Sequence, residues 1–152
     1  MSAMSTTDTT TGTAARTAPR GTGRADLLRT VLRTDSWSTA AFGVFLLAGS
    51  KALSAPFGIP TAWSVPIGIA MLGGAAALAL IAGYPRIPTG PAAAVIAGNA
   101  LSFLAMLLLT FSGLLPLTGL GTVFLVTGAV VVAGYAVLEY VGLRRYVSVE
   151  QG

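Results

Sequence analysis

Charged side chains are scarce over most of this chain of 152 residues, and their distribution constrains the fold more than any other feature. The chain holds nine Lys and Arg residues and five Asp and Glu residues, yet only Lys51, Arg86 and Glu139 lie between Ser36 and Leu143. A soluble domain carries ~25% charged residues and uses them to cover its surface. The sequence therefore excludes an ordinary water-soluble globule and predicts a small integral membrane protein.

Four stretches are long and apolar enough to cross a hydrocarbon core of ~30 Å, which takes about 20 residues of helix. Short segments rich in Pro and Gly separate them, and these residues end helices. Strands of a membrane barrel are shorter and alternate in polarity. Because the connections are short, successive helices should be antiparallel. We expect an all-α polytopic membrane protein with a four-transmembrane-helix antiparallel bundle over 36–145, the spans being 36–55, 62–83, 91–112 and 118–142.

The two ends of the chain differ from this apolar region. Residues 1–23 are rich in Ser and Thr, which predicts a disordered N-terminal tail on the cytoplasmic side. In 24–35, Leu and Val recur at helical spacing between Arg residues, which predicts a separate amphipathic helix at the membrane interface. Asp35 is then placed to cap the first span. Residues 146–152 form a predicted cytoplasmic C-terminal tail.

The basic residues predict the orientation. Eight of the nine precede the first span, follow the fourth, or lie between the second and third. Since cytoplasmic loops carry the excess of Lys and Arg, we expect a multi-pass plasma-membrane protein with both termini cytoplasmic. The positive charge then indicates contact with anionic lipid of the cytoplasmic leaflet rather than with nucleic acid. The candidate lipid contacts are Arg24, Arg29, Arg33, Arg144 and Arg145.

A cleaved signal peptide ending at Ala55 is the competing interpretation of the first span. It is disfavoured because Lys51 interrupts the apolar stretch and Pro56 would follow the cut.

Few residues are available for chemistry. The chain has no Cys and no His, which excludes disulfides, thiol catalysis and the commonest metal ligand and general base. Its five carboxylates are scattered along the sequence. We therefore expect no enzyme activity, no cofactor and no metal site.

Three polar residues inside the spans are candidate functional positions, because such groups are costly in a membrane. Lys51 lies ~6 Å from the outer end of its span, so it either extends to the headgroups or holds an anionic group. Asn99 lies near mid-depth, and its amide should bond across helices to Ser50, Thr127 or a backbone carbonyl, or else line a polar route. Glu139 lies near the cytoplasmic end, where an ion pair with neighbouring arginines is the simplest role.

Small residues recur at four-residue spacing in the spans and let helices approach closely. They predict bundle packing or homo-oligomerisation, and they occur at Ala70–Gly74, Gly73–Ala77, Ala94–Gly98–Ser102 and Ala129–Ala133.

Three sequence features are informative together: the Arg-rich segment before Asp35, the pair Asn99 and Ser102, and the C-terminal segment 139–145. In these features the chain resembles the small uncharacterised four-helix integral membrane proteins of actinobacteria. The resemblance covers roughly 27–145 and implies a fold and a location but no activity. Small multidrug transporters carry a Glu in their first helix, whereas the predicted first span has Lys51 and no acid. DoxX-like proteins also have four spans, but no motif here requires that assignment.

We therefore expect a non-enzymatic membrane module that packs against itself or binds another membrane protein. The alternative is a homo-oligomeric transporter or channel for a small solute, with Asn99 and Lys51 along its route. An enzyme subunit that handles lipid or quinone is the third and least supported interpretation.

Overall fold

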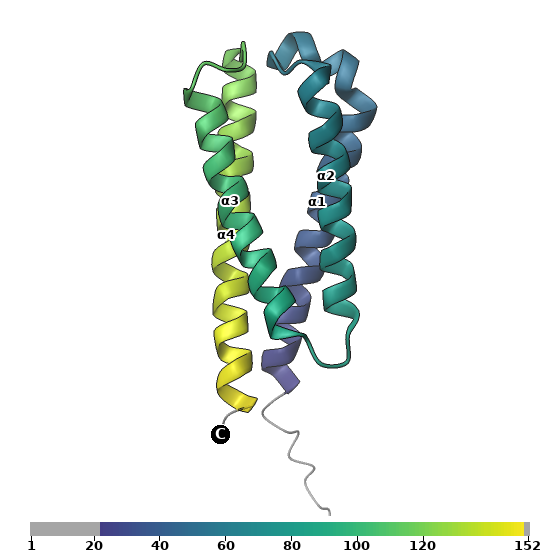
Figure 1. The fold of residues 1–152 in the computed structure, drawn as a ribbon, viewed down its shortest axis with the longest axis vertical. Helices are drawn as coiled ribbons and strands as arrows, with labels where there is room; N and C mark the ends of the chain where they lie inside the picture. The colour runs from purple at the N-terminus through teal and green to yellow at the C-terminus, as the bar shows by residue number, and fades with distance from the viewer. Residues whose placement is uncertain (1–21, 151–152) are drawn as a thin grey trace, which may run out of the picture.

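The computed structural model describes residues 22–150, and within that range it holds four helices and no strand. They are α1 (Thr22–Phe57), α2 (Thr61–Gly83), α3 (Thr89–Phe111) and α4 (Gly119–Glu150). Figure 1 shows the chain turning at alternate ends of an elongated bundle. All four helices are long and apolar enough to cross a membrane, which confirms the all-helical class predicted from the sequence.

The first helix is longer than the sequence predicts. The stretches 24–35 and 36–55, expected as an interfacial helix and a separate span, form one continuous helix. The reason lies in packing, because Leu28 and Leu32 are fully buried in a cluster with residues of α2, of the α2–α3 connection and of α3. This part of α1 therefore belongs to the bundle.

The last helix also extends beyond the predicted span of 118–142 and ends at Glu150. Most of the predicted C-terminal tail is thus helical, and the rest of it lies outside the described residues. The predicted N-terminal tail lies outside them as well, apart from the first two residues of α1.

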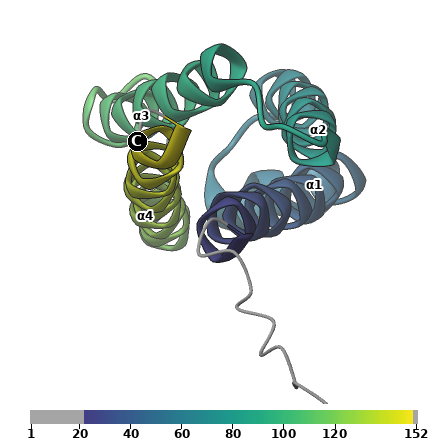
Figure 2. The same ribbon diagram turned by 90° about the horizontal axis from the view of Figure 1, so that it is seen from below.

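The helices pack as two hairpins. Helix α1 lies along α2 and α3 lies along α4, while α1 also contacts α4 and α2 barely touches α3. Figure 2, a view along the bundle, shows the four helices arranged in a ring. Within the first hairpin, Ser36 Oγ donates a hydrogen bond to the Ala75 carbonyl at 2.8 Å. A Cβ added at Gly43 would lie 3.1 Å from the Gly68 carbonyl oxygen, so small residues let these two helices approach closely.

The two hairpins are joined at both ends of the bundle. At the end that carries the α2–α3 connection, the buried leucines of α1 contact Ala82, Ile87 and Ala92. At the opposite end, Thr118 donates to the Pro56 carbonyl through its hydroxyl (2.6 Å) and to the Phe57 carbonyl through its backbone (3.3 Å). The hairpins are thus joined at both ends of the bundle, and its middle lies between these contacts.

Gly58 makes the tight turn at the end of α1. Its φ of +68° lies in the left-handed region that other residues rarely adopt. A side chain there would also collide with the Pro116 carbonyl of the opposite hairpin. The residue therefore serves both the turn and the contact between hairpins.

Candidate functional site: a buried carboxylate cluster beside an interhelical cavity

Three helices contribute to a polar cluster in the interior. The Asn99 amide nitrogen of α3 donates to Asp35 Oδ2 of α1 at 2.9 Å and to Glu139 Oε2 of α4 at 3.0 Å. An amide NH2 group has two hydrogens, so it can supply one to each carboxyl group. Thr39 Oγ1, one turn along α1, donates to Asp35 Oδ1 at 3.0 Å. The amide thereby joins two acidic side chains from different hairpins.

The two acidic side chains of the cluster are almost completely removed from solvent. Asp35 is 2% exposed and Glu139 is 0% exposed. Glu139 Oε1 is buried without a hydrogen-bond partner among the described residues. Buried carboxylates are costly unless they are paired, so an acidic pair held by neutral groups is an unusual arrangement.

The cluster lies well inside the bundle. Arg29 Nη2 of α1 donates to the Tyr84 and Pro85 carbonyls of the α2–α3 connection at 2.9 and 3.1 Å, which fixes the level of that end. Asp35 is six residues further along α1, or ~9 Å at the helical rise, and Asn99 is ~15 Å along α3 from Thr89. The acidic pair is therefore within the candidate membrane spans.

These positions correct two of the sequence-based interpretations. Asp35 does not cap a helix, because it lies inside the continuous helix α1 and bonds to Asn99. Glu139 is not paired with an interfacial arginine; its bonded neighbour is the same amide. The spacing of Asp35, Ser38 and Thr39 on one helical face was the available signal.

Asn99 does bond across helices, as its mid-span position predicts, but its partners are the two carboxyl groups. Those partners were missed because the predicted first span began after Asp35 and the other acid was assigned to the membrane edge.

A cavity of about 750 Å³ lies between the hairpins and is lined by all four helices. Its volume is within the range of ~300–1,000 Å³ found for sites that hold drug-sized ligands. Its polar lining gathers near the acidic cluster and comprises Asp35, Ser38, Thr39, Asn99, Ser102 and Tyr135, with Ser64 and Thr127 further along. The remaining lining is apolar, so the cavity has one polar end and a long apolar part.

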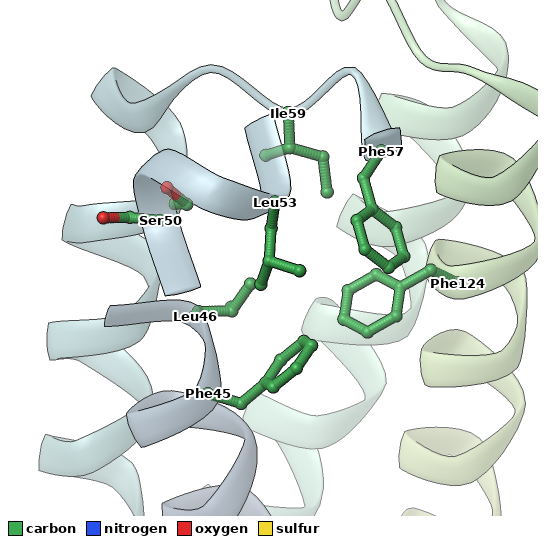
Figure 3. Close-up of a pocket in the computed structure, with 8 residues that line it drawn as sticks. Phe45, Leu46, Ser50, Leu53, Phe57, Ile59 and Phe124 are labelled. Atoms are coloured by element: carbon green, nitrogen blue, oxygen red, sulfur yellow. The ribbon is translucent and has the colours of Figure 1, made fainter. Parts of the chain in front are cut away.

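Aromatic side chains gather towards the apolar end of the cavity. The rings of Phe57 and Phe124 lie 5.0 Å apart at 65°, and Phe42 and Phe45 lie 6.2 and 6.1 Å from the Phe124 ring. Figure 3 shows Phe45, Phe57 and Phe124 facing one another across α1 and α4. The hollow beside them, next to Leu53, has a volume of about 10 Å³, which is room for no more than one water.

Small residues create the cavity. Ala70 and Gly74 of α2 and Gly98 and Ser102 of α3 belong to the predicted close-packing stripes, and all four line the cavity. A Cβ added at Gly74 or Gly98 would have no atom within 4 Å. These stripes thus leave space between α2 and α3 within the described chain instead of bringing the two helices together.

The other predicted positions lie apart from the cluster. Lys51 is exposed on α1, and its side chain is not part of the cavity wall. Arg33, Arg144 and Arg145 are exposed, and the Arg144 guanidinium lies 5.8 Å from the centre of the Tyr140 ring. The Arg24 side chain lies outside the described residues. Among the residues that are described, no group of three His, Cys, Asp or Glu side chains is placed to hold a metal ion.

Comparison of the chain with protein-family models, with curated proteins and with solved structures finds no match. The resemblance to actinobacterial four-helix proteins therefore stays a prediction, and the function has to be argued from the geometry.

Proposed function

We propose that this chain is a non-enzymatic carrier that binds a small amphipathic molecule inside a four-span bundle. The observation that carries the proposal is the cavity of about 750 Å³ with its polar end at Asp35 and Asn99. A ligand with one polar group and an apolar body matches this lining. The proposal develops the small-solute alternative predicted from the sequence.

The route of entry follows from helix packing. Contacts between the hairpins join both ends of the bundle, while α2 and α3 make almost no contact along its side. A ligand that enters between α2 and α3 comes from the bilayer and not from water. Molecules that partition into lipid are therefore the ligands that this cavity favours.

The proposed setting is the plasma membrane, with antiparallel spans and both termini cytoplasmic. The start of α1, the α2–α3 connection and the C-terminal end all lie at one end of the bundle (Figure 1). Arg29, Arg33, Arg86, Arg144 and Arg145 belong to these segments. The positive-inside rule assigns that end to the cytoplasm, where exposed arginines meet anionic lipid.

A partner-binding membrane module is the second candidate. It is supported by the same lack of contact between α2 and α3, because a helix of another protein, or of a second copy, would fit beside small residues there. This candidate requires a polypeptide at a fixed ratio in the native assembly.

Two neighbouring glycines of α2 allow a matched test. A side chain added at Gly73 or Gly74 meets no atom within 4 Å, but only Gly74 lines the cavity. Gly74→Leu should therefore fill the cavity, whereas Gly73→Leu adds the same side chain outside it.

The assay is mass spectrometry of the intact assembly, extracted in native lipid discs. We expect a bound small molecule in the wild type and in Gly73→Leu, and at least a tenfold lower occupancy in Gly74→Leu. Equal occupancy in both variants would refute the proposal. A second polypeptide lost only from Gly74→Leu would instead establish the partner-binding module.

A further inference from the structure

The acidic cluster is arranged to hold positive charge. Asp35 Oδ2 and Glu139 Oε2 accept from the same amide nitrogen, so these two oxygens lie within about 6 Å of each other, a distance at which like charges oppose each other's ionisation. The groups that the structure bonds to them are an amide and a hydroxyl, and both are neutral. Among the described residues, two ionised carboxylates would therefore be buried together without a compensating cation.

A second observation points to a missing partner. Glu139 is fully buried, and its Oε1 has no donor among the described residues. Native proteins rarely leave a buried carboxyl oxygen unpaired. A proton on the pair would reduce the charge and add a donor at the same time.

The two acids differ in their access to the cavity. Asp35 and Asn99 line it, whereas Glu139 lies behind them and does not. A positive group on a molecule in the cavity therefore comes nearest to the acidic pair at Asp35. Glu139 would sense that group through the shared amide.

We propose that this cluster holds one positive charge at a time, either a proton on its carboxyl pair or the cationic group of an amphipathic molecule in the cavity. The inference rests on the proposed function, and it names the ligand class as lipophilic cations. Binding of the cation breaks the O–H bond of the protonated carboxyl group, and the proton leaves to water. One positive charge enters as one departs, so the net charge of the site is unchanged.

The surrounding groups that the structure describes do not supply a competing charge. On α1 the neighbouring charged groups are Arg29, which is held by the carbonyls of the α2–α3 connection, and Arg33, which is exposed. On α4 the neighbouring titratable groups are Glu139 and Tyr135, whose hydroxyl accepts from Ser38 at 2.9 Å. Helices α2 and α3 place no titratable side chain in the described cavity wall. The carboxyl pair is thus the group that titrates when a cation binds.

The test uses the full chain in lipid nanodiscs and titration calorimetry with tetraphenylphosphonium. Tetraphenylborate, which has nearly the same shape and the opposite charge, is the matched control ligand, and empty nanodiscs give the background. Titrations in buffers with different ionisation enthalpies report the number of protons released. We expect close to one proton released per cation, and an affinity that rises roughly tenfold per pH unit where the pair is protonated.

Three variants separate charge from shape. Asp35→Asn should weaken the cation at least tenfold, because its direct contact is removed. Glu139→Gln should retain binding but lose the pH dependence over the range in which the wild type shows it. Gly73→Leu, which lies outside the cavity and keeps both acids, should release protons as the wild type does. Because the main readout is proton release by the wild-type chain, a variant that fails to fold does not prevent the test.

The outcomes distinguish the two proposals. Cation binding without proton release, or equal binding of tetraphenylborate, would overturn the exchange site and leave the carrier in place. Binding of neither probe would also overturn the exchange site, and the Gly73 and Gly74 variants then decide on the carrier independently.

Discussion

Removal of the Asn99 side chain is the perturbation with the clearest energetic consequence. In Asn99→Ala, Asp35 Oδ2 and Glu139 Oε2 both lose their donor while they stay buried. Hydrogen bonds to charged groups contribute ~1.5–3 kcal/mol each, and a buried acceptor left unpaired has a full desolvation cost. The Asn99 amide nitrogen donates both of these hydrogen bonds, so the substitution removes two at once.

The membrane lowers that estimate. Hydrogen bonds between membrane helices average ~0.6 kcal/mol, with a maximum of ~1.7, because the unfolded chain also finds partners. The Asn99 bonds should exceed this average, since their acceptors are the oxygens of two buried carboxyl groups. We expect Asn99→Ala to lower the free energy of unfolding by about 3 kcal/mol, between the two sets of values.

Thermal unfolding in detergent, followed by circular dichroism at 222 nm, measures this loss. For a chain of this length 1 kcal/mol corresponds to a shift of ~2–4 °C in Tm, so a fall of ~6–12 °C is expected. Ser102→Ala is the matched control, because it removes a polar cavity-lining side chain from the same helix. Its Tm should change by less than ~2 °C.

The shared amide also predicts an energetic coupling between Asn99 and the two acids. If the loss comes from two carboxyl groups without a donor, it should shrink to less than half in a background that carries Asp35→Asn and Glu139→Gln. The same Tm loss in both backgrounds, or a loss below ~0.6 kcal/mol in the wild-type background, would show that the two carboxyl groups do not depend on the Asn99 amide.

Three further changes test the ends of the bundle. Gly121→Ala places a Cβ against the last carbonyl of α1 and should destabilise the fold by ~1–3 kcal/mol in thermal unfolding, whereas Gly119→Ala, with open space around it, should be within ~0.5 kcal/mol of wild type. Phe124→Ala removes three aromatic contacts and should lower stability by ~1.5–4 kcal/mol; an unchanged Tm would argue against a stabilising role of these contacts. Arg29→Met removes two hydrogen bonds to the α2–α3 connection and should speed amide hydrogen exchange there at least tenfold, while exposed Arg33→Met should not; equal exchange in the two variants would contradict the anchoring role.

The carboxylate cluster shows where sequence reasoning was incomplete. Glu139 and Asn99 were recognised as polar positions within spans, because any such residue is conspicuous among apolar neighbours. The role of Asp35 was missed because the segment before it, which contains Leu and Arg but no Pro, is equally compatible with an interfacial helix and with the first turns of a longer span. Burial of Leu28 and Leu32 against α2 and α3 decides between them, and that contact involves residues far apart in the chain.

The small residues also show a limit of prediction from sequence. Their four-residue spacing predicts close helix approach, which Gly43 and Gly68 do provide between α1 and α2. The same residue types at Gly74 and Gly98 border a cavity instead. Spacing along one helix cannot tell which face a neighbouring helix will cover.

The sequence by itself determines that this chain forms four long apolar helices with breaks near Pro56–Pro60, Tyr84–Pro88 and Gly113–Leu117. Apolar run lengths and helix-ending residues are local properties, so they can be read without knowledge of the partner helix. Only the tertiary structure brings Asp35, Asn99 and Glu139 to one point and leaves a cavity beside them. Those features depend on how three helices are rotated and shifted against one another, and packing sets that rotation and shift.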